Sequence, residues 1–162
     1  MVDDIFININ LFYHITVLII WNKTLMYNQE YKNQFSLLLK ILPCLKGQNK
    51  LILKGGTAIN LFYRDLPRIS VDIDLTYTEI ENREDTIKHI NEALDNLGSL
   101  ITKRIPNAKI HKRLSRNNDY ILKLNVSDSK SIVKIEPNFI FRGTVHDALQ
   151  LPMSQHSHTA IW

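Results

Sequence analysis

The stretch LILKGGTAINLFYRDLPRISVDIDL, residues 51–75, determines the fold and the candidate site. Its apolar run 51–53 predicts a short buried strand, which the adjacent Gly55 and Gly56 interrupt. The following TAINLFY, with Thr57 near its start, predicts a helix. Glycine lets a ligand approach the main chain, and the start of a helix attracts anions. The glycine pair therefore predicts either a phosphate-binding turn or an ordinary tight turn.

The segment VDIDL, residues 71–75, is the second feature of this stretch. In a strand, Ile73 would face the core while Asp72 and Asp74 would share the opposite face, roughly 6 to 7 Å apart. Two like charges at this spacing repel, and a divalent cation compensates the repulsion. Paired carboxylates can hold the two metal ions used in phosphoryl transfer. The alternative is a solvated strand face.

The remaining elements follow from hydrophobic periodicity. Pro43 ends the first helix, Asn82 begins the second, and Gly98 predicts its C-terminal stop. The sequence SDSK separates the last two strands as a turn, so these strands form an antiparallel hairpin. The periodicity assigns helices to 27–42 and 82–97, and strands to 120–126 and 131–141. We therefore expect an α+β fold, a small mixed sheet with helices packed on it.

Composition limits the class of protein. The chain has 162 residues, the size of one domain, and 44% of them are hydrophobic, so we expect a single folded domain over 1–162. The only cysteine, Cys44, excludes an intrachain disulfide and a thiolate zinc cluster, and favours the reducing cytoplasm. The apolar segment 1–23 carries Asp3 and Asp4 where an export signal is positive, which predicts a buried element and no membrane span. The net charge of +4 permits a polyanionic partner.

The segment KGGTAINLFYRDLPRISVDIDL resembles the signature of the nucleotidyltransferase superfamily that includes DNA polymerase beta. More narrowly, it resembles the AbiEii/AbiGii-type toxin nucleotidyltransferases, in which a Gly-Gly-Thr turn precedes an Arg-x-Ser-x-Asp-x-Asp strand. The matching residues are Gly55, Gly56, Thr57, Arg68, Ser70, Asp72 and Asp74. The resemblance covers a core of about 25–142 and implies a nucleotidyltransferase-like fold. The tail 143–162 is short for this family, so we expect a C-terminally shortened member.

The resemblance also implies a third carboxylate on a later strand. Glu136 in the late hairpin fills this place, and Pro137 beside it predicts a ladder defect or an edge. The competing carboxylates are Asp119, Asp128 and Asp147.

Basic residues near these carboxylates have two interpretations each. Lys134 and Lys123 reach a triphosphate or are simply solvated. Arg64 and Arg68 hold phosphate or pair with Asp65.

The resemblance implies transfer of a nucleoside monophosphate from a nucleoside triphosphate to a hydroxyl acceptor, with Mg²⁺ or Mn²⁺ as cofactor. The metal ligands would be Asp72, Asp74 and Glu136. The nucleotide-binding residues would be Gly55, Gly56, Thr57, Arg68, Ser70 and Lys134. For this toxin family the resemblance suggests RNA as acceptor, especially the 3′ end of tRNA, in a toxin–antitoxin or phage-defence system with an antitoxin partner.

Two questions stay open at this level. The basic run KRIPNAKIHKRLSR, residues 103–116, either follows an RNA backbone or forms a solvated loop. A small-molecule or protein hydroxyl is the alternative acceptor. The alternative to an enzyme is a catalytically silent nucleotide- or RNA-binding module.

Overall fold

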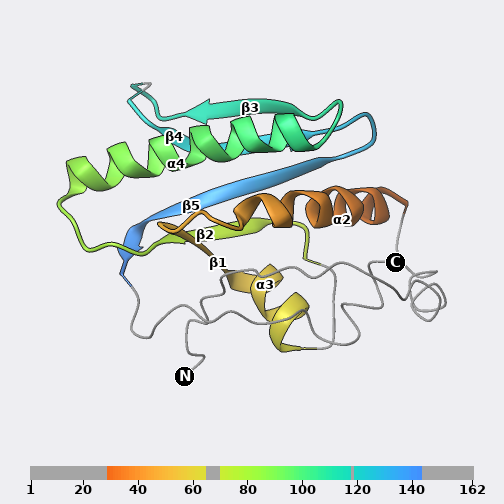
Figure 1. The fold of residues 1–162 in the computed structure, drawn as a ribbon, viewed down its shortest axis with the longest axis horizontal. Coiled ribbons are helices and arrows are strands. Elements are labelled where there is room, and N and C mark those ends of the chain that lie inside the picture. The colour runs from red at the N-terminus through yellow and green to blue at the C-terminus, as the bar shows by residue number, and fades with distance from the viewer. Residues whose placement is uncertain (1–28, 65–69, 118, 144–162) are drawn as a thin grey trace.

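The computed structural model describes residues 29–64, 70–117 and 119–143, which form a five-stranded sheet with helices packed on it (Figure 1). The elements in chain order are α2 (Gln29–Ile41), η1 (Leu42–Leu45), β1 (Leu51–Lys54), α3 (Gly55–Ala58), η2 (Ile59–Tyr63), β2 (Ile73–Tyr77), α4 (Arg83–Arg104), β3 (Lys109–Leu114), β4 (Ile121–Ser127) and β5 (Ile132–Arg142). No helix in the described part of the chain is long and apolar enough to cross a membrane. The predictions for 1–23, Asp65, Arg68, Asp147 and the tail from 144 onward lie outside the described residues.

The strand order is β1-β2-β5-β4-β3. β2 pairs with β5 in parallel, whereas the other neighbouring pairs, β1 with β2, β5 with β4 and β4 with β3, are antiparallel. The sheet is therefore mixed, which confirms the predicted α+β fold. Because β5 lies between β2 and β4, the two segments with the predicted carboxylates are neighbours.

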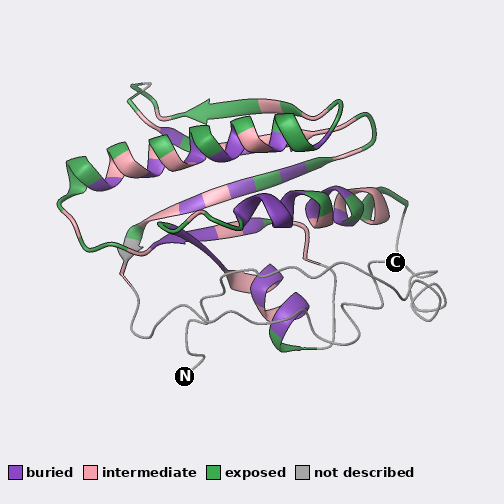
Figure 2. Ribbon diagram, viewed as in Figure 1, coloured by how far each residue is buried: buried purple, intermediate pink, exposed green. Residues whose placement is uncertain are grey.

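The two faces of the sheet differ in their surroundings. Helices α2 and α4 cover one face, which we call the helix face (Figure 1). Strand side chains such as Leu75, Leu124 and Ile135 are fully buried there and share one core with Leu38 of α2 and Leu94 of α4. Figure 2 shows the buried side of each helix turned toward the sheet. Alternate strand residues project from the opposite side, which we call the open face. The open face includes Asp74, Lys109, Arg113, Lys123, Lys134 and Glu136.

Helix α4 begins where the sequence predicted and ends later. The Asn82 side chain accepts a hydrogen bond from the Asp85 amide at 2.9 Å, which caps the helix. Gly98, predicted as the stop, lies inside the helix, which continues to Arg104. A Cβ atom at Gly98 would lie 3.6 Å from Ile110 of β3, an ordinary contact. Basic residues in the last turn favour the extension, since they interact well with the helix C-terminus.

Strand β3 occupies part of the basic run, for which no strand was predicted. Its residues are almost all exposed, so the sequence lacks the alternation that marks a half-buried strand. The expectation of a solvated loop was therefore wrong for Lys109–Leu114, and the expectation that this run follows an RNA backbone stays a prediction. β3 pairs with β4 along its length and forms one edge of the sheet.

The predicted hairpin of β4 and β5 is confirmed. In its turn, the Asp128 carboxylate accepts the backbone amides of Lys130 and Ser131 at 2.8 and 2.9 Å. Burial raises the pKa of Asp128, but these bonds and the Ser131 hydroxyl outweigh it and leave the pKa lowered. A register shift at the start of β4 places Ile121 in the core and leaves Leu122 more exposed, which explains the broken alternation there.

Candidate functional site

The glycine pair forms the start of α3 and leaves no loop between strand and helix. Gly55 directly follows β1 and has a φ of +73°, a backbone conformation that favours glycine. A Cβ atom at Gly55 would overlap the carboxylate of Asp74. The main chain of Gly55 therefore lies directly against Asp74. Because the first amides of a helix have no partner within it, the amides at Gly55 and Gly56 have no acceptor in α3.

The helix continues from α3 into the π-helical turn η2, where the Arg64 amide donates to the Ile59 carbonyl at 2.8 Å. π-Helical turns often mark functional sites. The residue pattern of TAINLFY predicted a helix but contains no signal for this geometry.

Thr57 connects α3 to the segment before β2. Its side chain is fully buried, and its hydroxyl donates to the Asp72 carbonyl oxygen and lies 2.9 Å from the Ser70 hydroxyl. The helix start and the first aspartate are thereby held together. Its burial and these two contacts indicate that Thr57 positions the helix start, and direct contact of its hydroxyl with the triphosphate stays a prediction.

The three predicted carboxylates come together where the start of β2 lies beside the middle of β5. β2 begins at Ile73, so Asp72 precedes the strand and is exposed, a correction to the predicted strand 71–75. Asp74 lies in β2 directly opposite Glu136 of β5. Burial raises the pKa of Asp74, the charges of Asp72 and Glu136 raise it further, and the charge of Lys54 lowers it. Asp74 is thus the centre of a group of mutually repelling carboxylates.

Two lysines lie beside these carboxylates: Lys54, to which the sequence pattern gave no role, and Lys123, for which contact with a triphosphate or solvation was open. Lys54 ends β1 opposite Asp74. Its place directly before the two glycines was the available signal. Lys123 of β4 forms an ion pair with Glu136 at 2.7 Å. Lys134 lies two residues before Glu136 on the open face and is exposed, so its contact with a nucleotide stays a prediction.

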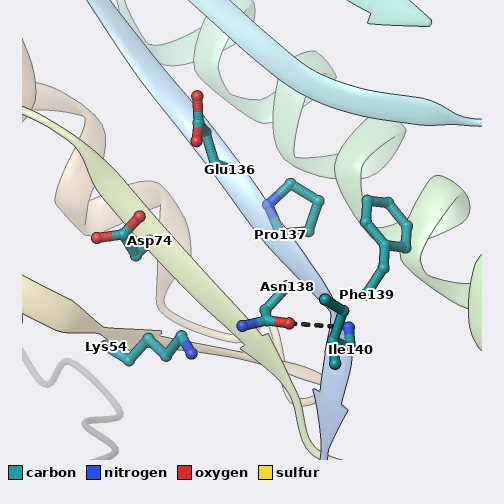
Figure 3. Close-up of a pocket in the computed structure, with 7 residues that line it drawn as sticks. All are labelled: Lys54, Asp74, Glu136, Pro137, Asn138, Phe139 and Ile140. Atoms are coloured by element: carbon teal, nitrogen blue, oxygen red, sulfur yellow. Dashed lines mark hydrogen bonds between the residues drawn. The ribbon is translucent and has the colours of Figure 1, made fainter. Parts of the chain in front are cut away.

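A cavity of about 350 Å³ adjoins Asp74 (Figure 3). Its lining residues are Lys54, Asp74, Glu136, Pro137, Asn138, Phe139 and Ile140. Charged groups and an apolar surface therefore meet in one depression. A nucleotide presents the same combination, an anionic phosphate chain and a flat base.

Pro137 lies within β5, in the interior of the sheet. It pairs with Leu75 of β2, and the pairing of β5 with β4 ends at Ile135. The missing amide of proline therefore falls beyond the end of the β4 ladder, as the sequence predicted.

The donor chemistry of the site fits a divalent cation. Carboxylate oxygens are the ligands that Mg²⁺ and Mn²⁺ prefer, and a cation would relieve the repulsion that raises the pKa of Asp74. Within residues 29–64, 70–117 and 119–143, however, no three His, Cys, Asp or Glu side chains are arranged to hold a metal ion. Lys123 bonds one oxygen of Glu136, Oε1, so a cation would bind the second oxygen or replace this bond. The metal assignment of Asp72, Asp74 and Glu136 stays a prediction.

The competing carboxylates that the structure describes lie in turns. Asp128 holds the hairpin turn, and the Asp119 amide bonds the Ser115 hydroxyl at 3.0 Å in the connection between β3 and β4. Neither lies opposite Asp74 in the sheet, whereas Glu136 does. Glu136 is therefore the best third carboxylate among the described candidates.

The structure thus places a glycine helix start against a strand carboxylate on a mixed sheet. A family model described as "Nucleotidyl transferase AbiEii toxin, Type IV TA system" matches residues 36–160. The chain belongs to this AbiEii family, which confirms the resemblance seen in residues 54–75. No curated protein and no solved structure was found to match the chain.

Proposed function

We propose that this chain transfers a nucleoside monophosphate from a nucleoside triphosphate to a hydroxyl group. The observation that carries the proposal is the position of Asp74, in contact with the Gly55 main chain and opposite Glu136. Family membership supports nucleotidyl transfer as the reaction class. Phosphoryl transfer depends mostly on positioning and on compensation of charge, and this site provides groups for both.

Each side of the site has a separate part in the reaction. The amides of Gly55 and Gly56 face the phosphate chain of the donor, and Lys54 adds a positive charge beside it. Arg68, Ser70 and Lys134 complete the predicted nucleotide contacts. The acceptor oxygen forms a bond to the α-phosphorus while the bond from this phosphorus to the leaving pyrophosphate breaks. The hydroxyl proton passes to water in the same step.

Asp72, Asp74 and Glu136 would hold Mg²⁺ or Mn²⁺. Such cations, when bound, compensate the negative charge on the attacking and leaving oxygens. Glu136 would take this role with the oxygen that Lys123 does not bond, or with both oxygens if Lys123 releases it. Lys123 is then free to compensate charge on the phosphates.

RNA, especially the 3′ end of tRNA, is our proposed acceptor, and the proposed setting is a cytoplasmic toxin controlled by an antitoxin. Membership of a family of type IV toxin–antitoxin systems supports the toxin and antitoxin parts. The basic side chains on the open face support a polyanionic acceptor.

The experiment is a transfer assay with each α-labelled nucleoside triphosphate, Mg²⁺ and total RNA, followed by separation of RNA, protein and small-molecule fractions. We expect label in RNA. Label in protein or in a small molecule would reject RNA as acceptor and retain the enzyme.

A catalytically silent nucleotide- or RNA-binding module is the second candidate. The ion pair between Lys123 and Glu136 favours it, because it neutralises the third carboxylate. Tight triphosphate binding without label in any fraction would support this candidate over the enzyme.

A further inference from the structure

The basic run 103–116 is divided between the two faces of the sheet. Lys112 projects to the helix face and forms an ion pair with Asp95 of α4 at 2.6 Å. Lys109 and Arg113 project to the open face, because neighbouring residues of a strand alternate in direction. Only part of this run therefore shares a face with Asp74.

Strand pairing links this basic part directly to the site. Arg113 of β3 pairs with Lys123 of β4, and Lys123 bonds Glu136 of β5, which lies opposite Asp74 of β2. Side chains at paired positions project from the same face. A continuous row therefore crosses four strands, from Arg113 to Asp74. With strands about 4.8 Å apart, the row extends roughly 10 Å outward from β5.

A second row lies beside the first. His111 of β3 pairs with Asn125 of β4, which pairs with Lys134 of β5. Lys109, His111, Arg113 and Lys134 are exposed, and the described residues provide no salt-bridge partner for any of them. The outer part of the open face is thus an unneutralised basic surface.

We propose that the open face of β3, β4 and β5 is the docking surface for the phosphate backbone of a single-stranded RNA whose end enters the site at Asp74. The inference rests on the proposed function and adds the place where the acceptor binds. Its basis is charge complementarity together with continuity of the row with the site. A small acceptor would need no basic surface two strands away from the reacting group. His111 offers an exposed ring on which a base can stack.

The test compares two double variants that remove the same charge from opposite faces. Lys109→Gln with Arg113→Gln alters the open face, and Lys103→Gln with Lys112→Gln alters α4 and the helix face. Neither pair includes a residue assigned to the nucleotide or metal site. The probe is a fluorescein-labelled single-stranded RNA of about 12 nucleotides, within the span that single-strand binding modules cover. Anisotropy gives its affinity at several salt concentrations without nucleoside triphosphate.

The open-face variant should bind the RNA about 25-fold more weakly at about 0.1 M salt, because two phosphate contacts on a single strand contribute a salt slope of about 1.4. The slope of the logarithm of affinity against the logarithm of salt concentration should also fall by about 1.4. The helix-face variant should stay within about twofold of the unmodified protein, since exposed pairs such as Lys112–Asp95 contribute little. Lys109→Arg with Arg113→Lys keeps both charges and should retain binding, which separates lost charge from a damaged fold.

An equal loss of RNA affinity in both double variants, or no loss of affinity in the open-face variant, would contradict the proposed docking surface. Displacement of the RNA by polyglutamate at equal charge concentration would also overturn it, in favour of an acidic protein partner. Pyrophosphate release measured in parallel keeps the two proposals apart. If pyrophosphate is released but the RNA affinity does not depend on the open-face residues, the proposed enzyme is retained and the docking surface is rejected. If RNA binding depends on the open-face residues but no pyrophosphate is released, the docking surface is retained and the proposed enzyme is rejected.

Discussion

Gly55 is the residue whose backbone most directly shapes the site. Gly55 and Gly47 both have positive φ values, +73° and +89°, but a Cβ atom at Gly47 would meet nothing within 4 Å. Gly47→Ala should therefore measure the cost of the backbone conformation alone, about 1 to 2 kcal/mol. Gly55→Ala should cost more in urea unfolding, because its Cβ also overlaps Asp74.

The excess cost at Gly55 can be assigned to Asp74 by a double-mutant cycle. In an Asp74→Ala background most of the excess should disappear, since the overlapping carboxylate is gone. An unchanged excess would show that Gly55 does not lie against Asp74. Gly55→Ala should also weaken triphosphate binding, measured by calorimetry, more than Gly47→Ala does.

Asp74 should lower the stability of the fold when no divalent cation is bound. Its folded-state pKa is raised by burial and by the charges of Asp72 and Glu136, so the folded protein binds a proton more readily than the unfolded chain. At a pH above the folded-state pKa, the ionised Asp74 therefore lowers the free energy of unfolding. This destabilisation disappears as the pH falls through the folded-state pKa toward the unfolded value of 3.8. Asp74→Asn should therefore raise Tm by a few degrees at neutral pH in EDTA.

The pH dependence provides the control for this variant. The gain in Tm from Asp74→Asn should shrink as the pH falls toward the unfolded value, and salt should reduce it, because the site is partly exposed to solvent. A gain that is constant from neutral to acidic pH would point to a packing effect instead. A lower Tm at neutral pH would contradict the repulsion inferred for Asp74.

At the scale of elements, α4 provides a stability prediction. Gly98 lies within the helix, and a Cβ atom there would make only ordinary contacts of 3.6 to 4.0 Å with Ile110 and Leu124. Gly98→Ala should stabilise the protein by about 0.5 to 1 kcal/mol, because alanine loses less backbone entropy in a helix. Chemical denaturation measures this change.

At Gly143, in contrast to Gly98, replacement by alanine should lower the stability. Its φ is +75°, and a Cβ atom would lie 2.8 Å from Ile80, so Gly143→Ala should destabilise. If Gly98→Ala also destabilises the protein, the close packing of α4 on β3 leaves less room than the structure indicates.

The elements that the sequence predicted are those in which burial determines the residue pattern. The helix from Asn82 and the hairpin around Asp128 combine a hydrophobic pattern with a local capping or turn signal. β3 has no such pattern, since an exposed edge strand does not need apolar alternation. Gly98 was predicted as a stop from the local sequence alone, which contains no information about the strands that pack against the helix.

At the scale of the whole molecule, strand order determines which distant residues meet. The sequence placed Asp72 and Asp74 beside the glycine pair by their short separation, and the structure keeps Asp74 there. The choice of Glu136 came from the family resemblance, because nothing local shows that β5 lies next to β2. Lys123 became visible as a partner of Glu136 only through the pairing of β4 with β5.

The central claim is that the carboxylates beside the Gly55 turn support nucleotidyl transfer, and the rate of pyrophosphate release tests it for any acceptor. With nucleoside triphosphate, Mg²⁺ and total RNA, Asp74→Asn should reduce the rate by at least about 10²-fold, as expected for loss of a group that stabilises transition-state charge. Its Tm should not fall below that of the unmodified protein. Release at an undiminished rate by the folded Asp74→Asn variant would contradict the account.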